Sequence, residues 1–77
     1  MLLNVSVLNM SRVVFQGQAE KVIVPGEEGV FEVLPFHKRI LSRLVTGSVI
    51  IDQRSIPIRR GVVKADHNQV VIILEEK

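Results

Sequence analysis

The chain has no cysteine, tryptophan or tyrosine, and its only aromatic residues are three phenylalanines. Without cysteine it forms neither a disulfide nor a thiolate metal site, which excludes the small secreted scaffolds that depend on cross-links. No apolar run approaches the roughly 20 residues that cross a bilayer, and the N-terminus lacks the long apolar core of a signal peptide. We therefore expect an intracellular protein that is soluble or only peripherally attached to a membrane.

Valine, isoleucine and leucine must build the core, because 47% of the 77 residues are hydrophobic and few of these are aromatic. β-Branched side chains fit a pleated, half-buried surface better than a helix, where they lose rotamer freedom. A chain of this length forms one domain and buries only about 60% of the surface that it exposes when unfolded. The composition therefore favours a single all-β domain over residues 1–77.

Acidic and basic residues are unevenly distributed, although the net charge is only +2. Residues 37–64 contain seven lysines or arginines and a single acidic residue, Asp52, whereas both flanking segments are richer in acids. This separation of charge suits oriented binding to an acidic protein surface, and it also suits a phosphate backbone.

Short apolar runs separated by turn-forming residues are typical of many short strands. The clearest turn signal is the segment 25–29, where one proline and two glycines predict a sharp reversal. Pro57 predicts that its strand lies at a sheet edge, because proline donates no hydrogen bond to a neighbour. The expected strands cover residues 3–7, 13–15 with a possible bend at Gly17, 19–24, 30–33, a part of 38–45, 49–51, 56–58, 62–65 and 70–74. In the stretch 38–45 the spacing of Ile40, Leu41 and Leu44 also fits one face of a helix. The Thr46-Gly47 break follows too closely for a helix of ordinary length, so we expect a loop followed by a strand there.

Strands of this length and spacing predict a flattened β-sandwich or barrel of about eight to ten strands. Several of them, such as 22–24, 49–51 and 70–74, are apolar on both faces. One core cannot absorb both sets, so we expect an exposed apolar patch that marks a protein interface. The alternative is that loops and short strands cover these side chains.

Catalytic and metal chemistry find little support in the sequence. A nucleophile would need a base with an orienting group behind it, and the only candidate bases are His37, in a loop, and His67, in a hairpin turn. The acidic pairs Glu27-Glu28 and Glu75-Glu76 lack the ligand spacing of a metal site. We therefore expect no catalytic residue, no metal and no cofactor.

A small basic β-barrel that binds single-stranded nucleic acid is the alternative from another functional class. Such barrels combine a cationic groove with aromatic side chains on which bases stack. Three phenylalanines, at least two of them needed for the core, leave little for stacking. The sequence therefore favours a protein partner over a nucleic acid.

Residues 22–37 contain a Pro-Gly pair, a further glycine at 29 and a Leu-Pro-x-His element at 34–37. In residue types and spacing this segment resembles the hallmark segment of the epsilon subunit of F-type rotary ATP synthases. Residues 14–19, 47–51 and 68–74 resemble further strands of the same family, so the resemblance covers essentially the whole chain.

The resemblance implies a flattened β-sandwich of about ten strands that binds the central-stalk gamma subunit and the membrane c-ring. It further implies a non-catalytic, peripheral subunit at the cytoplasmic face of the inner or plasma membrane, attached only through the complex. The partner-binding residues that it implies, with the two cations that follow them, are Val30, Phe31, Glu32, Phe36, His37, Lys38 and Arg39.

This chain departs from the family pattern at several of these positions. Glu32 and Phe36 stand where the family has glycine, and larger side chains there are expected to need φ below zero or a shifted backbone. Lys38-Arg39 replaces Ala-Pro, and these two added cations change which residues of the c-ring could face the loop. The family commonly continues into a C-terminal helical hairpin that restrains ATP hydrolysis, so we assign neither that inhibition nor nucleotide sensing to these residues.

Overall fold

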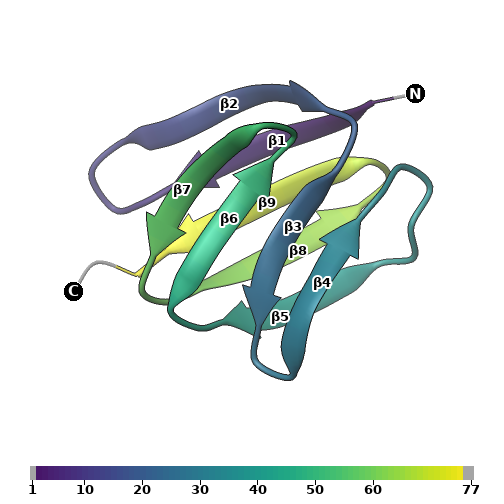
Figure 1. Ribbon diagram of the computed structural model, residues 1–77. Coiled ribbons are helices and arrows are strands. Elements are labelled where there is room, and N and C mark those ends of the chain that lie inside the picture. Colours follow the sequence, from purple (N-terminus) through teal and green to yellow (C-terminus); the bar gives the residue numbers. More distant parts are fainter. Residues whose placement is uncertain (1, 76–77) are drawn as a thin grey trace.

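A computed structural model describes residues 2–75, and these residues form nine β-strands and no helix. The strands form one continuous sheet that folds over into a front layer (β4-β3-β6-β7) and a rear layer (β2-β1-β9-β8-β5) (Figure 1). The predicted all-β sandwich of eight to ten strands is confirmed. The strands are β1 (Leu3–Leu8), β2 (Val13–Ala19), β3 (Val22–Gly26), β4 (Gly29–Val33), β5 (Ile40–Leu44), β6 (Gly47–Ile51), β7 (Arg54–Ile58), β8 (Gly61–Asp66) and β9 (Gln69–Leu74).

The core between the layers consists of aliphatic side chains, as the composition predicted. Alternate residues of nearly every strand point inward, and β-branched side chains pack well on such a pleated surface. Phe15 and Phe31 are only partly buried at its margin. The buried hydrophobic residues are Leu3, Val5, Val7, Ala19, Val22, Val24, Val33, Leu44, Val49, Ile51, Ile58, Val63, Ala65, Val70 and Ile72.

The sheet folds over between β3 and β5, where Gly26 and Leu44 form the only residue pair. Gly26 also pairs with Gly29 at the closed end of the β3–β4 hairpin. A Cβ atom on Gly26 would lie 2.6 Å from a ring carbon of Phe31 and 2.8 Å from the carbonyl oxygen of Gly29. Only glycine therefore lets the backbone and the Phe31 ring approach this closely.

Several expectations about single elements are confirmed. The stretch 38–45 is a loop followed by a strand, β5, and Pro57 lies on β7, the last strand of the front layer. The reversal at 25–29 is the β3–β4 hairpin, although only Gly29 of its two glycines has positive φ (131°).

Two details of the predicted strand pattern are wrong. Ala19 ends β2, and the turn at 20–21 separates it from β3, which starts only at Val22. The β1–β2 register shifts beside Val14, because Leu8 pairs with Val13 whereas Val7 pairs with Phe15. The Asn9 side chain accepts hydrogen bonds from two backbone amides of the connecting turn at 2.7 and 2.9 Å, so this turn sets the register at the start of β2. Gly17 pairs regularly with Val5.

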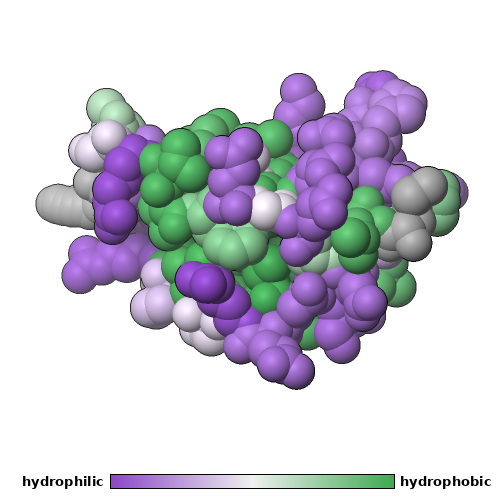
Figure 2. Space-filling view, turned by 90° about the horizontal axis from the view of Figure 1, so that it is seen from above, coloured by the Kyte–Doolittle hydropathy of each residue, from purple (hydrophilic) through white to green (hydrophobic). Residues whose placement is uncertain are grey.

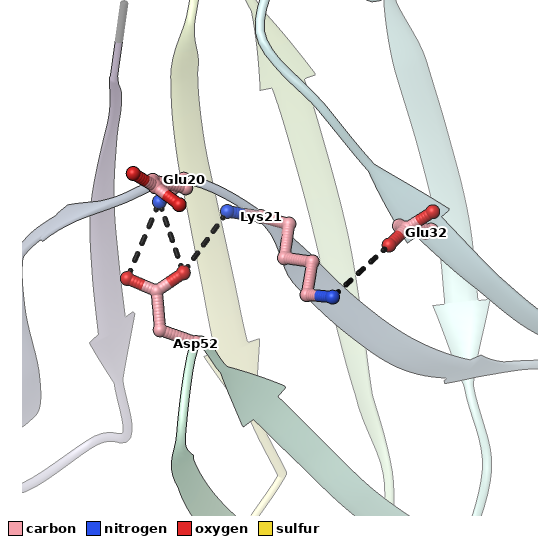
Figure 3. A network of polar contacts seen from close by, with 4 residues as sticks. All are labelled: Glu20, Lys21, Glu32 and Asp52. Atoms are coloured by element: carbon pink, nitrogen blue, oxygen red, sulfur yellow. Dashed lines mark hydrogen bonds and ion pairs between the residues drawn. The ribbon is translucent and has the colours of Figure 1, made fainter.

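The Asp52 carboxylate ties the β6–β7 turn to the crossover from β2 to β3 (Figure 3). Its Oδ1 accepts hydrogen bonds from the backbone N–H of Glu20 at 3.0 Å and of Lys21 at 3.2 Å, while Oδ2 accepts from Glu20 at 3.3 Å. The Asp52 N–H donates in return to the Lys21 carbonyl oxygen at 3.2 Å. Asp52 has φ of 53°, a conformation that Asp and Asn tolerate better than most residues. The Asp52 side chain thus accepts from the backbone N–H groups of the crossover, which would otherwise need water as their hydrogen-bond acceptor.

We predict that Asp52→Ala lowers the free energy of unfolding by about 2 kcal/mol, because it removes charge-assisted hydrogen bonds and places alanine at positive φ. Asp52→Asn retains an acceptor and the backbone preference, so it should lose less than about half as much. Urea denaturation of the two variants beside the unmodified chain measures the difference. Equal losses for Ala and Asn would contradict the role given to the side-chain acceptor.

Candidate partner-binding surface

The outer face of the rear layer carries an apolar patch that crosses four strands. Ile73 of β9 pairs with Val62 of β8 and with Leu8 of β1, and Val71 lies two residues away from Ile73 on the same face. Leu41 of β5 extends the patch and is 74% exposed. These five residues, here called the rear patch, confirm the expectation that strands apolar on both faces leave apolar surface outside the core.

Two cations lie within the rear patch. Arg43 pairs with Val62 across the β5–β8 ladder, and Lys64 lies between Leu41 and Val71. Among residues 2–75, neither cation forms an ion pair with an acidic side chain. The patch therefore offers apolar contact together with positive charges that a partner can neutralise.

The outer face of the front layer is also partly apolar and points the opposite way. Ile23 and Ile50 are paired and half-buried there, and Val30 is 72% exposed on the neighbouring edge strand β4. Glu32 lies on this face beside Ile23 and forms an ion pair with Lys21 at 3.9 Å. Glu32 keeps regular strand geometry without positive φ, as expected for a non-glycine residue.

The seven residues predicted to bind a partner do not converge on one point. Val30 and Glu32 lie on the outer front face, whereas Phe31 points inward, opposite the buried Val24, and packs against the core. The other four lie in the loop between β4 and β5, at the end of the sandwich. A contact role for Phe31 stays a prediction, and its inward position leaves its ring little free surface.

The loop between β4 and β5 begins with a tight turn over residues 34–37. The His37 N–H donates to the Leu34 carbonyl oxygen at 3.2 Å, and Phe36 has φ of 66°. Pro35 cannot take positive φ, so proline at the second position and positive φ at the third define a type II turn. Of the two outcomes expected at Phe36, φ below zero is wrong. Its side chain points into solvent and is 75% exposed, so the ring has room.

The loop is fastened to the β8–β9 turn, which the sequence did not connect with this site. Asn68 Oδ1 accepts a hydrogen bond from the Phe36 N–H at 2.6 Å, and Arg39 lies 3.6 Å from the Asp66 carboxylate. Asn68 and His67 both have positive φ, which is the geometry of a type I′ hairpin turn. No sequence pattern links positions 32 residues apart, so only the spatial proximity of the two turns reveals Asn68 as a support of the loop.

Each of the two histidines contacts an oxygen of a neighbouring residue. His37 Nδ1 lies 3.0 Å from the Lys38 carbonyl oxygen, and His67 Nδ1 lies 3.0 Å from Asp66. Within residues 2–75 no three His, Asp or Glu side chains are close enough to hold a metal ion. That same stretch contains no helix with the length and apolar character to cross a membrane.

Apolar side chains also gather at the side of the molecule where β2 and the β6–β7 hairpin lie uppermost in Figure 1. Figure 2 looks onto this side and shows an apolar centre bordered by hydrophilic side chains. Here the Arg54 guanidinium of β7 lies 5.3 Å from the centre of the Phe15 ring of β2, a cation–π contact between the two layers.

Comparison with known proteins identifies relatives over nearly the whole chain. The family model "ATP synthase, Delta/Epsilon chain, beta-sandwich domain" matches residues 2–76. An ATP synthase epsilon chain from Sulfurimonas denitrificans is 33% identical, and one from a Nitratiruptor species is 36% identical, each over 95% of this chain. The chain spans 60% of the length of each of these relatives.

Two solved structures have the same fold at low sequence identity. One is a chain of the Euglena gracilis mitochondrial ATP synthase, solved as OSCP/F1/c-ring, with a TM-score of 0.87 and 16% identity over 97% of this chain and 51% of that one. The other, from the central stalk/c-ring of the Tetrahymena thermophila mitochondrial ATP synthase, has a TM-score of 0.78 and 10% identity. It covers 96% of this chain and 63% of that one.

We predict that two neighbouring residues of β9 differ sharply in their contribution to stability. Ile72 is fully buried, so Ile72→Ala should lower the free energy of unfolding by about 2–5 kcal/mol. Ile73 belongs to the rear patch and is 55% exposed, so Ile73→Ala should cost less than about 1 kcal/mol. Denaturant titration compares the two, and a loss at Ile73 equal to that at Ile72 would show that the patch belongs to the core.

Proposed function

The chain belongs to the family of ATP synthase delta/epsilon-chain β-sandwich domains, and on this premise we propose that it is a structural part of the rotor stalk. It binds the gamma subunit and the c-ring, holds them together as both turn, and so helps to couple ion movement to ATP synthesis. It carries no reaction of its own. It lies at the cytoplasmic face of the inner or plasma membrane and is held there only through the complex.

The observation that carries this proposal is apolar surface on both outer faces of the sandwich. The rear patch lies on the outer face of the rear layer and the Ile23–Ile50 pair on that of the front layer, so two neighbours can be contacted at once. Val30 lies at the edge where the sheet folds over, and it lines one hollow with Leu41, Arg43 and Val62. Surfaces of this kind mark protein interfaces in a small domain. The relatives named ATP synthase epsilon chain, and the neighbours solved together with a c-ring, support partners within an ATP synthase complex.

Charge gives this contact its orientation. Arg43 and Lys64 lie within the rear patch without an acidic partner among the described residues, and Lys38 and Arg39 add cations at the adjoining loop. Acidic groups on the partner would pair with these side chains, which speeds association and selects one docking geometry.

The nucleic-acid alternative gains no support from the positions of the aromatic rings. Phe15 and Phe31 pack against the core, and Phe36 alone is well exposed. A single ring is a poor platform for successive bases. Retention on single-stranded DNA across a salt series distinguishes a nucleic-acid-binding barrel from a rotor-stalk subunit, because phosphate binding weakens steeply as salt rises.

Reconstitution with gamma and the c-ring of the same ATP synthase tests the proposed function. The chain should co-purify with this subcomplex in about equal molar amounts. The absence of any association, under conditions in which an established epsilon chain binds its own subcomplex, would count against the proposal.

We predict that Lys64→Glu weakens binding to the gamma–c-ring subcomplex by about tenfold at low salt, because it places an acid opposite the acidic groups of the partner. Arg12→Glu, in the β1–β2 turn, makes the same charge change outside the rear patch and should have little effect. A binding titration at two salt concentrations measures both, and the effect of Lys64→Glu should shrink as salt increases. An equal loss of affinity in the two variants would show that the rear patch is not part of the interface.

A further inference from the structure

Phe36 combines two features that do not stabilise the chain itself. Its φ of 66° is disfavoured for an L-residue by roughly five- to thirtyfold in equilibrium terms. The other non-glycine residues with positive φ in the described part of the chain are Asp52, His67 and Asn68, polar residues in hairpin turns where this conformation is common. An aromatic residue in the glycine position of a type II turn is exceptional.

The ring gains little inside the chain in return. It is 75% exposed and is not among the partly buried side chains that pack against the core. Strained residues persist where the surrounding structure holds them in place, and they cluster at sites of binding and catalysis. The conformation of Phe36 therefore points to a role outside the free domain.

The surrounding contacts hold Phe36 in a defined orientation. Pro35 fixes the preceding φ angle, and the hydrogen bond from His37 to Leu34 closes the turn. The Phe36 N–H is held at 2.6 Å by Asn68 Oδ1, a contact between two tight turns. A side chain presented on so constrained a backbone loses little entropy on binding.

We infer that Phe36 is the anchor of the interface with the rotor stalk and inserts into an apolar pocket of the partner protein, with Asn68 as the residue that positions it. This inference deepens the proposed function and rests on it. Aromatic anchors in desolvated pockets commonly carry much of the binding energy of an interface. His37, Lys38 and Arg39 are exposed beside the ring, and within residues 2–75 only Arg39 of these three is paired with an acid, Asp66 of β8. The rim of the pocket should accordingly be acidic.

A shaped protein pocket explains the rigid turn better than a lipid surface does. Binding to a bilayer depends on the apolar area inserted and on the number of nearby cations, and it needs no defined backbone geometry. One ring held in a strained conformation offers little apolar area. It offers instead a fixed direction, which matters only for a complementary cavity.

The test measures stability and binding on the same variants. Phe36→Gly relieves the backbone strain, so the folding equilibrium of the free chain should shift about threefold or more toward the native state, while affinity for the gamma–c-ring subcomplex falls about 30-fold. Phe36→Ala removes the ring but keeps the strain, so it should lose similar affinity without becoming more stable. Gln53→Ala removes an exposed side chain from the β6–β7 turn, outside both the rear patch and the β4–β5 loop, and should leave affinity unchanged.

Two substitutions test the positioning role of Asn68. Asn68→Gly tolerates the positive φ but removes the side-chain acceptor, so affinity for the subcomplex should fall several-fold. Asn68→Asp keeps an acceptor and should bind the subcomplex more tightly than the glycine variant. Hydrogen exchange at the Phe36 amide supplies a readout that does not depend on the partner. Exchange should accelerate in Asn68→Gly and stay slow in Asn68→Asp.

The outcomes separate this inference from the proposed function. If the unmodified chain binds the subcomplex and the Phe36 variants bind equally well, Phe36 is not the anchor and the rotor assignment stands. If the unmodified chain does not bind at all, the proposed function fails and the inference fails with it. Vesicles of anionic phospholipid serve as the second probe. Loss of vesicle binding in Phe36→Gly, with subcomplex binding retained, would overturn the protein pocket in favour of a lipid contact.

Discussion

The folding-over of a single sheet at Gly26 is the constraint on which the rest of the molecule depends. Each layer alone would expose one continuous apolar face, and the layers bury these faces only because β3 and β5 meet at the Gly26–Leu44 pair. Any side chain at position 26 would collide with the Phe31 ring and the Gly29 backbone. The two layers can therefore enclose the aliphatic core only with glycine at position 26, which has no room for a Cβ atom.

The small size of the domain explains why apolar residues remain outside this core. Strands of five or six residues are flanked by few loops that could cover a second face, so the rear patch and the residues around Val30 stay accessible. In a larger domain such strands would be covered on both sides. In the function that we propose, a neighbouring subunit takes that place, and Arg43 and Lys64, which form no ion pair within residues 2–75, help to orient it.

Positive φ angles serve two different purposes in this chain. At Asp52 and at the His67–Asn68 turn they close tight hairpins, and the side chains of Asp52 and Asn68 also bond to distant backbone amides. At Phe36 the same conformation directs an apolar ring into solvent. The first use stabilises the fold, whereas the second serves the partner contact that we infer for Phe36.

The sequence alone determined the strand pattern, the aliphatic core, the edge position of Pro57 and the family, because periodicity, turn residues and motif spacing are local properties. It misplaced the irregularity of β2, whose register follows from the side-chain hydrogen bonds of the Asn9 turn. It also named Phe31 and Phe36 alike as contact residues, since nothing in the chain distinguishes an inward ring from an outward one. Only the tertiary structure, by bringing Asn68 against residue 36 and Asp52 against residues 20 and 21, decided which side chains are held in place and which remain free for a partner.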